Sequence, residues 1–337
     1  MVNGGHHAFK AADRSYLSLL KREVHAIAAK LPFTQKRLGE LDIVVSEITS
    51  NLVKHAKDGE LLVQPINDHF GDGIELIALD GGSGIDELEK MMADGASTTR
   101  TLGQGLGAIK RLSDTFQVFT LKDWGTVLLS RMYVSEPPFY SKAPKVEVRC
   151  VQVPKPHEEV SGDGYWSKLE NDTLKIFVGD ALGHGMEAHK VILKAIEFVK
   201  NDTETNVVDT LRAMHLHMYR SRGLVATLAS YDFKTKHWSM CGIGNISTRL
   251  GNAAFGKAYA PYNGIVGANI PTTMNAQSVT GEYNQSIILC SDGVKSRWDI
   301  AKFPNIFRYD PSILAACVYK SFTRKTDDTM VLVAKVG

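Results

Sequence analysis

Apolar residues recur along this chain with two different periods, and each period predicts a type of element. Leu41, Val45, Ile48 and Leu52 are spaced three or four positions apart, which predicts an amphipathic helix over about 34–57. Helices are also expected at about 11–30, 185–201 and 206–221, and a helical segment is expected to follow the glycines at 103, 105 and 107. The helical pattern is therefore present in both halves of the chain.

Shorter apolar runs predict strands in both halves. In the N-terminal half they lie near 60–66, at 74–80 and within 115–134. In the C-terminal half they are VEVRCVQV, LKIFVGD, VATLASYDF, HWSMCGIGN, SIILCSDG and TMVLVAKV. The mixture of elements predicts an α+β fold class.

A proline-rich segment separates the two patterned halves. SEPPFYSKAPK, residues 135–145, holds three of the eleven prolines and reads as a short, semi-stiff linker. We therefore expect two domains, at 8–134 and 146–337. A chain of 337 residues that is 44% hydrophobic is long enough to give each domain a core of its own.

Composition narrows the classes of partner. Lys plus Arg is 39 and Asp plus Glu is 37, and no basic run is interleaved with aromatic residues, which argues against nucleic acid. The four cysteines are scattered without a C-x-x-C pair and are expected to be reduced. No signal-peptide region or run of eighteen apolar residues occurs, so we expect a cytoplasmic protein with no membrane partner.

Three features of the N-terminal half are candidates for chemistry. Glu47 and Asn51 are spaced i, i+4 on the edge of a helical stripe, where a base and a metal ligand could lie side by side. Asp80 ends the strand IELIALD before Gly82 and Gly84, where it could recognise an exocyclic amino group. A solvated polar edge and an ordinary turn are the alternative interpretations.

The third feature is the glycine-rich stretch TLGQGLGAIKRL, with Gly103, Gly105 and Gly107. Its G-x-G-x-G spacing fits neither the dinucleotide fingerprint nor the P-loop. Glycines before a helix let backbone N–H groups approach an anion, and the helix N-terminus favours negative charge. A purely structural turn is the alternative.

Taken together, E-x-x-x-N, D-x-G-x-G, G-x-G-x-G and a late Gly125-Thr126 resemble the GHKL ATP-binding fold. Within it the chain is similar to the RsbT/RsbW-like serine kinases and anti-sigma factors. SEITSNLVKHA resembles their N box, and ADGASTTRTLGQGLGAIKRLSDTF resembles the lid region of the RsbT type. The resemblance covers about residues 8–134 and implies a Bergerat α/β sandwich.

This resemblance assigns roles to individual residues. It implies that Asn51 holds Mg²⁺, that Glu47 is the general base, and that Asp80, with Thr126, binds the adenine of ATP. It also implies that five glycines shape the pocket and the phosphate lid: Gly82, Gly84, Gly103, Gly105 and Gly107. His55 is expected to pack or cap, and Lys110 and Arg111 are expected to be solvated helix charges.

In the C-terminal half, acidic residues end or interrupt apolar strands at four places. They are Asp163 in SGDGYW, Asp180 in LKIFVGDALGHG, Asp292 in SIILCSDGV, and Asp327 with Asp328 in RKTDDTMVLV. Carboxylates at buried strand ends are costly unless they are paired or bound to metal. If the fold brings them together, oxygen ligands favour magnesium or manganese over zinc. For any single D-G, a turn is the alternative.

The same pattern resembles the RsbX/SpoIIE-like metal-dependent serine phosphatases, over about residues 146–337. The resemblance implies an α-β-β-α sandwich that holds two Mn²⁺ or Mg²⁺ ions. Asp180 would bridge the two metals, with the carbonyl of Ala181 as a further ligand. Asp292 and Asp327 would complete one metal site, and Asp163 would hold the second ion through water.

Some positions depart from this family pattern. Trp166 stands where many relatives have a further Asp, so a third, weaker metal position is in doubt. Ala181 replaces a common glycine, which matters little for a carbonyl ligand. His184 is expected to be a turn residue, with assistance to the leaving group as the alternative. His215 and His217, two apart in a helical stretch, cannot share a face and are expected to bind nothing.

The combined resemblance predicts a bifunctional regulatory enzyme. An ATP-dependent protein serine kinase and a metal-dependent phosphoserine phosphatase would act on STAS-domain, anti-anti-sigma or stressosome partners in bacterial partner switching. One alternative is a phosphatase whose N-terminal domain binds ATP and sequesters a sigma factor or a STAS antagonist. Another is a phosphatase whose N-terminal domain only senses nucleotide. A homodimer is compatible with the first resemblance.

Overall fold

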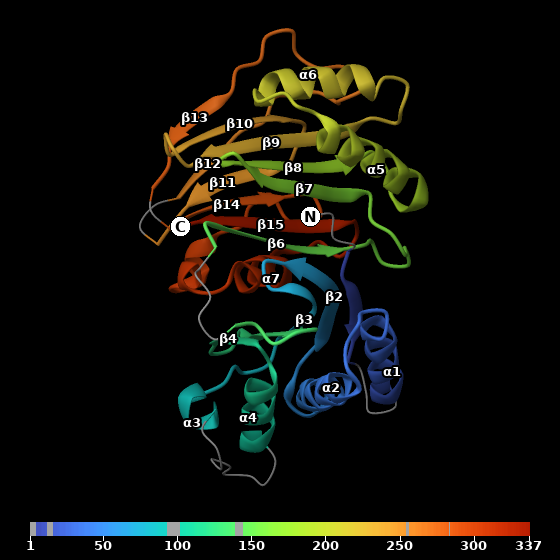
Figure 1. The fold of residues 1–337 in the computed structure, drawn as a ribbon, viewed down its shortest axis with the longest axis vertical. Helices are drawn as coiled ribbons and strands as arrows, with labels where there is room; N and C mark the ends of the chain where they lie inside the picture. Colours follow the sequence, from blue (N-terminus) through green and yellow to red (C-terminus); the bar gives the residue numbers. More distant parts are fainter. Residues whose placement is uncertain (1–4, 12–15, 93–101, 139–143, 254–255, 283) are drawn as a thin grey trace. The chain divides into compact units, whose positions relative to one another are not determined.

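The computed structural model describes residues 5–11, 16–92, 102–138, 144–253, 256–282 and 284–337. The chain divides into two compact units, one formed by His6–Ala143 and the other by Met1–Gly5 with Pro144–Gly337. Figure 1 shows their elements, coloured along the sequence. Helices and antiparallel sheets occur in both units, so the predicted α+β class is confirmed.

The N-terminal unit is a five-stranded antiparallel sheet with helices against one face. Its strands in spatial order are β1 (His7–Lys10), β2 (Glu60–Asp68), β3 (Gly71–Asp80), β5 (Gly125–Tyr133) and β4 (Thr115–Leu121). Its helices are α1 (Tyr16–Ala28), α2 (Gln35–His55), α3 (Leu88–Met92) and α4 (Leu102–Leu112). The core lies between the sheet and α1, α2 and α4.

The start and the orientation of α2 follow from its sequence. Thr34 caps the helix, because its Oγ1 accepts a hydrogen bond of 3.2 Å from the N–H of Arg37. The predicted stripe is buried, with Leu41, Val45 and Ile48 each no more than 2% exposed in the core. Burying this stripe leaves the edge of α2 that carries Glu47 and Asn51 only half-buried.

The C-terminal unit contains two five-stranded antiparallel sheets. One sheet has the order β13 (Gln277–Thr280), β10 (His237–Ile243), β9 (Leu224–Asp232), β8 (Thr173–Ala181) and β7 (Asp163–Glu170). The other has the order β12 (Gly256–Tyr259), β11 (Ser247–Gly251), β14 (Gln285–Cys290), β15 (Thr329–Val336) and β6 (Val146–Val153). The helices are α5 (Gly185–Asn201), α6 (Val207–His217) and α7 (Pro311–Phe322), with short 3₁₀ turns at Ile300–Lys302 and Ile306–Arg308.

These elements form four layers within the C-terminal unit. One apolar cluster joins α5 and α6 to the outer face of the β7–β10 sheet, with Ile192 and Leu211 fully buried. A second cluster fills the space between the two sheets, around Val178, Trp238 and Leu332. Helix α7 packs on β15 and β6 at the opposite side (Figure 1). The predicted α-β-β-α sandwich is therefore confirmed.

Helix α7 is an element that the apolar pattern does not predict. Ten of its twelve residues are buried, so apolar side chains occur all round the helix and leave no stripe. Its start is nevertheless encoded locally, because the Asp310 side chain accepts a hydrogen bond of 2.8 Å from Ser312 N and Pro311 occupies the first turn. Among the described residues, no helix combines the length and apolar character needed to cross a membrane.

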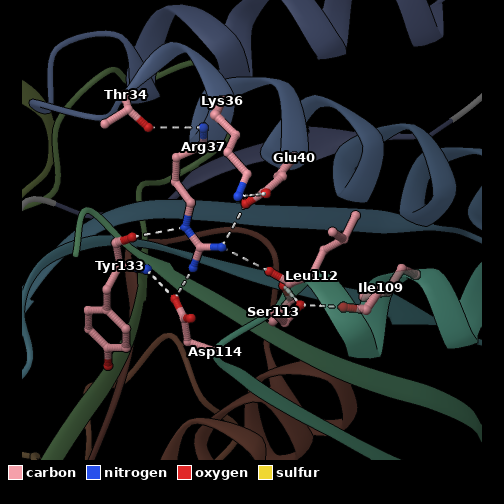
Figure 2. A network of polar contacts seen from close by, with 10 residues as sticks. Thr34, Lys36, Arg37, Glu40, Ile109, Leu112, Ser113, Asp114 and Tyr133 are labelled. Atoms are coloured by element: carbon pink, nitrogen blue, oxygen red, sulfur yellow. Dashed lines mark hydrogen bonds and ion pairs between the residues drawn. The ribbon is translucent and has the colours of Figure 1, made fainter. Parts of the chain in front are cut away.

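Arg37 connects the start of α2 to the C-terminal end of α4 (Figure 2). Its Nε donates to Tyr133 O at 3.2 Å, and its Nη1 donates to Glu40 Oε2 at 2.9 Å and to Leu112 O at 3.3 Å. Its Nη2 donates to Asp114, whose Oδ2 also accepts from Tyr133 N at 2.7 Å. One guanidinium thus satisfies the C-terminal carbonyl of α4 and fixes that helix against α2.

We expect Arg37→Met to lower the free energy of unfolding of the N-terminal unit by about 3–5 kcal/mol, because Asp114 would stay buried without its cation. Lys36→Met is the matched control. Lys36 is 83% exposed, and its ion pair with Glu40 spans 3.7 Å, so its loss should cost less than about 1 kcal/mol. Urea unfolding of the two variants beside the wild type measures the difference. Equal losses would show that the Arg37 network is not stabilising.

Candidate active sites

Helices α2 and α4 approach closely where three of the predicted site residues lie. Glu47 and Asn51 project from successive turns of α2, and Gly105 of α4 faces them. A Cβ added at Gly105 would lie 2.7 Å from Glu47 Oε2 and 3.7 Å from the amide of Asn51. The glycine therefore permits the helix contact, and any larger residue at position 105 would displace the Glu47 carboxylate.

The glycines at 103, 105 and 107 do not precede the helix, as the sequence analysis expected, because α4 begins at Leu102 and includes all three. That expectation was wrong for a tertiary reason. Leu106 and Ile109 are buried against α2, and this packing outweighs a helical cost of roughly 0.5–1 kcal/mol for each glycine. The preceding part of the lid region, residues 93–101, lies outside the described residues.

Asp80 occupies the last position of β3, opposite Thr126 on β5. Its Oδ1 accepts a hydrogen bond of 2.8 Å from the N–H of Gly82. Gly125 has a φ of +104°, and a Cβ there would lie only 2.0 Å from Asp80 O. The turn therefore requires glycine at position 125, which keeps Thr126 in register with Asp80.

A cavity of about 540 Å³ opens beside these residues. Its lining includes Asn51, Asp80, Gly82, Gly84 and Thr126, so five of the predicted nucleotide-site residues meet there. Glu47 is not part of the lining and lies beside Asn51 at the α4 contact.

His55, the last residue of α2, also lines this cavity. Burial, followed by the charge of Lys54, lowers the pKa of His55. Lys110 is exposed on α4 and is not part of the lining. The cavity thus combines an apolar wall with a carboxylate, an amide and a hydroxyl, which is a set suited to an aromatic amine and a hydrated cation.

In the C-terminal unit, strand register brings two predicted carboxylates together. Asp163 begins β7 and pairs directly with Asp180 near the end of β8, so the two side chains emerge on one face of the sheet. Asp163 is 1% exposed, and its Oδ2 accepts a hydrogen bond of 2.7 Å from Ser291 Oγ. Its Oδ1 has no hydrogen-bond partner among the described residues. Burial and the charge of Asp180 raise the pKa of Asp163 well above its ordinary value.

Further carboxylates act on Asp180 from two other turns. Burial, followed by the charges of Asp292, Asp327 and Asp328, raises the pKa of Asp180 to about 8. Mutually repelling carboxyl groups therefore converge on the end of β8. In the described part of the chain, no three His, Cys, Asp or Glu side chains are close enough to form a ready-made metal cage. The donor set suits hard cations that keep water among their ligands.

Asp327 and Asp328 have different surroundings, although they are neighbours in sequence. Asp328 is buried, and its two oxygens accept hydrogen bonds from Lys155 N and Gly162 N, both at 2.8 Å. Asp327 is only partly buried, and its Oδ1 accepts from the N–H of Asp328 at 3.0 Å. Asp328 therefore holds the loop before β7, whereas Asp327 can reach a ligand.

The remaining predicted positions are placed as follows. Ala181 ends β8 with its N–H bonded to Gly162 O at 3.1 Å. Asp292 Oδ2 accepts a hydrogen bond from Asn245 Nδ2 at 3.1 Å. Trp166, which replaces a carboxylate of the family pattern, lies in the α5/α6 core. It therefore supplies no ligand.

His184 is the N-cap residue of α5, and its Nδ1 lies 2.6 Å from Glu158 Oε1. No motif in the sequence points to Glu158, Ser291 or Arg222, all of which border the carboxylates or the loop after them. Only Ser291 carried a local signal, because it directly precedes Asp292. Glu158 and Arg222 reach this region through the fold alone.

Comparison with known proteins identifies relatives for each half. A family model described as a histidine kinase-like ATPase domain matches residues 10–132. Serine/threonine-protein kinase RsbT of Bacillus subtilis is 33% identical over 100 residues, which is 30% of this chain and 75% of RsbT. Phosphoserine phosphatase RsbX of the same organism is 22% identical over 150 residues, which is 44% of this chain and 75% of RsbX.

Two solved structures resemble the chain over more than half of its length. One, reported under "The bacterial stressosome: a modular system that has been adapted to control secondary messenger signaling", matches with a TM-score of 0.53 at 25% identity. It covers 57% of this chain and 100% of that one. RsbX in complex with magnesium matches with a TM-score of 0.52 at 19% identity, covering 58% of this chain and 98% of that one. The RsbX match shows a shared fold.

The convergence of negative charge predicts opposite effects for two substitutions. In chelator at pH 7, Asp180→Asn should stabilise the C-terminal unit by about 1–3 kcal/mol, because it removes a repelled carboxyl group. Asp328→Asn should destabilise it by about 1–3 kcal/mol, because an amide cannot accept both backbone N–H groups. Differential scanning calorimetry with and without Mn²⁺ measures both. A stabilising Asp328→Asn would contradict this assignment.

The raised pKa of Asp180 also predicts how stability depends on pH. The folded chain keeps the Asp180 proton up to a pKa of about 8, and the unfolded chain loses it near the ordinary value of 3.8. The folded state thus binds more protons between these values, so metal-free stability should fall as pH rises from 5 to 8. Thermal unfolding midpoints, measured from pH 5 to 8 in the presence of a metal chelator, test this expectation. A midpoint that rises over this range in the wild type, or an equal fall in Asp180→Asn, would count against it.

Proposed function

Because the chain belongs through its N-terminal unit to the family of the serine/threonine-protein kinase RsbT, we propose that it is a bifunctional regulator of protein phosphorylation. Residues 8–134 would form an ATP-dependent serine kinase, and residues 146–337 a metal-dependent phosphoserine phosphatase, joined by 135–145. The presence in one chain of two sites of opposite chemistry, a nucleotide-sized cavity and a convergence of carboxylates, carries this proposal.

In the kinase unit, the residues around the cavity suit ATP and one Mg²⁺ ion. The Asp80 carboxylate would accept a hydrogen bond from the adenine amino group, with Thr126 beside it, and Asn51 would be the magnesium ligand. When bound, the ion would neutralise phosphate charge. Gly82 leaves room beside Asp80, and Gly84, Gly103, Gly105 and Gly107 would shape the rest of the pocket and the phosphate-binding part.

Glu47 is proposed as the general base of phosphoryl transfer. It would take the proton of the acceptor serine hydroxyl while that oxygen bonds to the γ-phosphorus and the bond to the ADP oxygen breaks. Its half-buried position beside Asn51, held by the Gly105 contact, supports this role.

In the phosphatase unit, Asp180 would bridge two Mg²⁺ or Mn²⁺ ions, with the carbonyl of Ala181 as a further ligand. Asp292 and Asp327 would complete one metal site, and Asp163 would hold the other through water. Two bound ions would offset the carboxylate charge and lower the pKa of water at the site. Asn245 and Ser291 orient Asp292 and Asp163 through the hydrogen bonds described above.

We propose small STAS-domain proteins of a bacterial partner-switching pathway, in the cytoplasm, as the shared substrate. The likeness to RsbT in one half and to RsbX in the other supports a cycle of serine phosphorylation and dephosphorylation. Joining the two activities in one chain raises the local concentration of each site near a common partner. A futile cycle is then avoided only if partner binding or the 135–145 linker controls one activity.

A second candidate function is retention of a partner without phosphorylation. In that case the N-terminal unit would bind ATP and sequester a sigma factor or a STAS antagonist. The position of Glu47 outside the cavity lining is the observation that keeps this candidate open. Phosphate transfer to the partner distinguishes the two functions.

The decisive experiment incubates the full chain with γ-labelled ATP, Mg²⁺, Mn²⁺ and candidate STAS-domain proteins. If a candidate STAS protein is the substrate, we expect little net label on it with the wild type and strong labelling with Asp180→Ala, because removal of phosphate is lost. Glu47→Gln should lower the labelling rate by about 10²-fold or more, because the proton acceptor is lost. Asp42→Asn, at a carboxylate on the same helix that is 49% exposed, is the control and should leave the rate unchanged.

Absence of label under every condition would overturn the kinase proposal. If the chain retains a partner on an affinity column in the presence of ATP but does not label it, the sequestering function replaces it. The phosphatase is tested separately with chemically phosphorylated partner. Failure of the wild type to release phosphate with either Mg²⁺ or Mn²⁺ would overturn that half.

A further inference from the structure

Arg222 lies beside the loop that follows Asp180, and its role rests on the phosphatase function proposed above. Strands β8 and β9 pair so that Asp180 lies opposite Val225 and Ala181 opposite Leu224. The contact continues beyond the strands, because Leu182 N donates to Gly223 O at 3.1 Å. Arg222 is the next residue, so the pairing carries it to Gly183.

The guanidinium of Arg222 rests directly on the backbone at Gly183. Its Nη1 lies 2.8 Å from the position that a Cβ of residue 183 would occupy. Gly183 has a φ of +96°, a backbone conformation that favours glycine. The guanidinium of Arg222 therefore lies beside Gly183, which follows Asp180 by three positions in the sequence.

Arg222 is exposed, and among the described residues it makes no hydrogen bond or ion pair. The charge of Arg222 acts on the carboxylate of Glu187, in the first turn of α5. A hydrogen bond from Lys190 is the main cause that lowers the pKa of Glu187, and Arg222 adds a smaller effect. Since Lys190 Nζ already contacts Glu187 Oε1 at 2.6 Å, the guanidinium donors of Arg222 remain available.

A cation at this loop would reduce the repulsion between the carboxylates and a negatively charged phosphoserine substrate. A phosphoserine carries a charge of about −1.5 to −2 at pH 7 and would have to approach a site lined by carboxylates. Metal ions offset part of that repulsion, and an arginine at the rim can attract the outer oxygens. Its planar fork of N–H groups matches a phosphoryl group in two parallel hydrogen bonds.

We propose that Arg222 binds the phosphoryl oxygens of the phosphoserine substrate and positions it at the carboxylate site. The neighbouring side chains do not offer the same group. His184 is engaged by Glu158, and Arg220 lies over the ring of Tyr219, with its guanidinium carbon 5.6 Å from the ring centroid. Arg222 is thus the guanidinium that lies beside Gly183, in the loop that follows Asp180.

The test uses the full chain with Mn²⁺ and two substrates, p-nitrophenyl phosphate and a phosphoseryl peptide. Arg222→Gln should raise KM by about tenfold for both substrates and change kcat by less than about threefold, because a charged hydrogen bond to substrate is lost. The inhibition constant of inorganic phosphate should weaken by the same factor as KM. Arg222→Lys should recover part of the loss, because charge is kept without the fork.

Arg220→Gln is the matched control, because it removes an equal charge two residues away, and it should leave KM and the inhibition constant unchanged. If the wild type dephosphorylates neither substrate, the proposed phosphatase function fails, and this inference fails with it. If the wild type is active but Arg222→Gln leaves KM and the phosphate inhibition constant unchanged, the role proposed for Arg222 is wrong and the phosphatase function stands. A fall in kcat with an unchanged phosphate inhibition constant would equally overturn it, because Arg222 would then only shape the loop.

Discussion

The pairing of β8 with β7 on one side and with β9 on the other determines the chemistry of the C-terminal unit. The first pairing sets Asp163 against Asp180, and the second carries Arg222 to the loop that follows. A shift of one residue in either register would turn these side chains to the opposite face. The core clusters on the two faces of this sheet maintain the register, because they bury alternate residues of the same strands. Packing far from the carboxylates thus determines where they meet.

Buried negative charge is the energetic consequence of that arrangement. Within the described part of the chain, Asp163 keeps one oxygen without a hydrogen-bond partner, and the pKa of Asp180 is raised to about 8 by burial and neighbouring carboxylates. A site built for stability alone would place apolar residues or pairs of opposite charge here. The structure instead uses Ser291 and Asp328 to keep the carboxylates and their loop in place. Such a site is stable when cations neutralise it.

In the N-terminal unit, two glycines allow the backbone to pack closely against the candidate site residues. Gly105 brings α4 against Glu47 and Asn51, and Gly125 brings the β4–β5 turn against Asp80. Arg37 holds the C-terminal end of α4 (Figure 2). Helix α4 is thus fixed to α2 near both of its ends. The glycines of this unit therefore act partly as packing residues, and not only as flexible backbone for an anion.

The sequence by itself determined the α+β class and the residue types available at each candidate site, because periodicity and short motifs are local properties. It could not predict α7, whose burial on all sides leaves no stripe, or the start of α4, which packing against α2 decides. It could not separate the roles of Asp327 and Asp328, because Lys155 and Gly162 bond the second and not the first. Contacts such as that between Ser291 and Asp163, 128 positions apart, exist only after strand register and burial are set. Only the tertiary structure could therefore decide which side chains share a site.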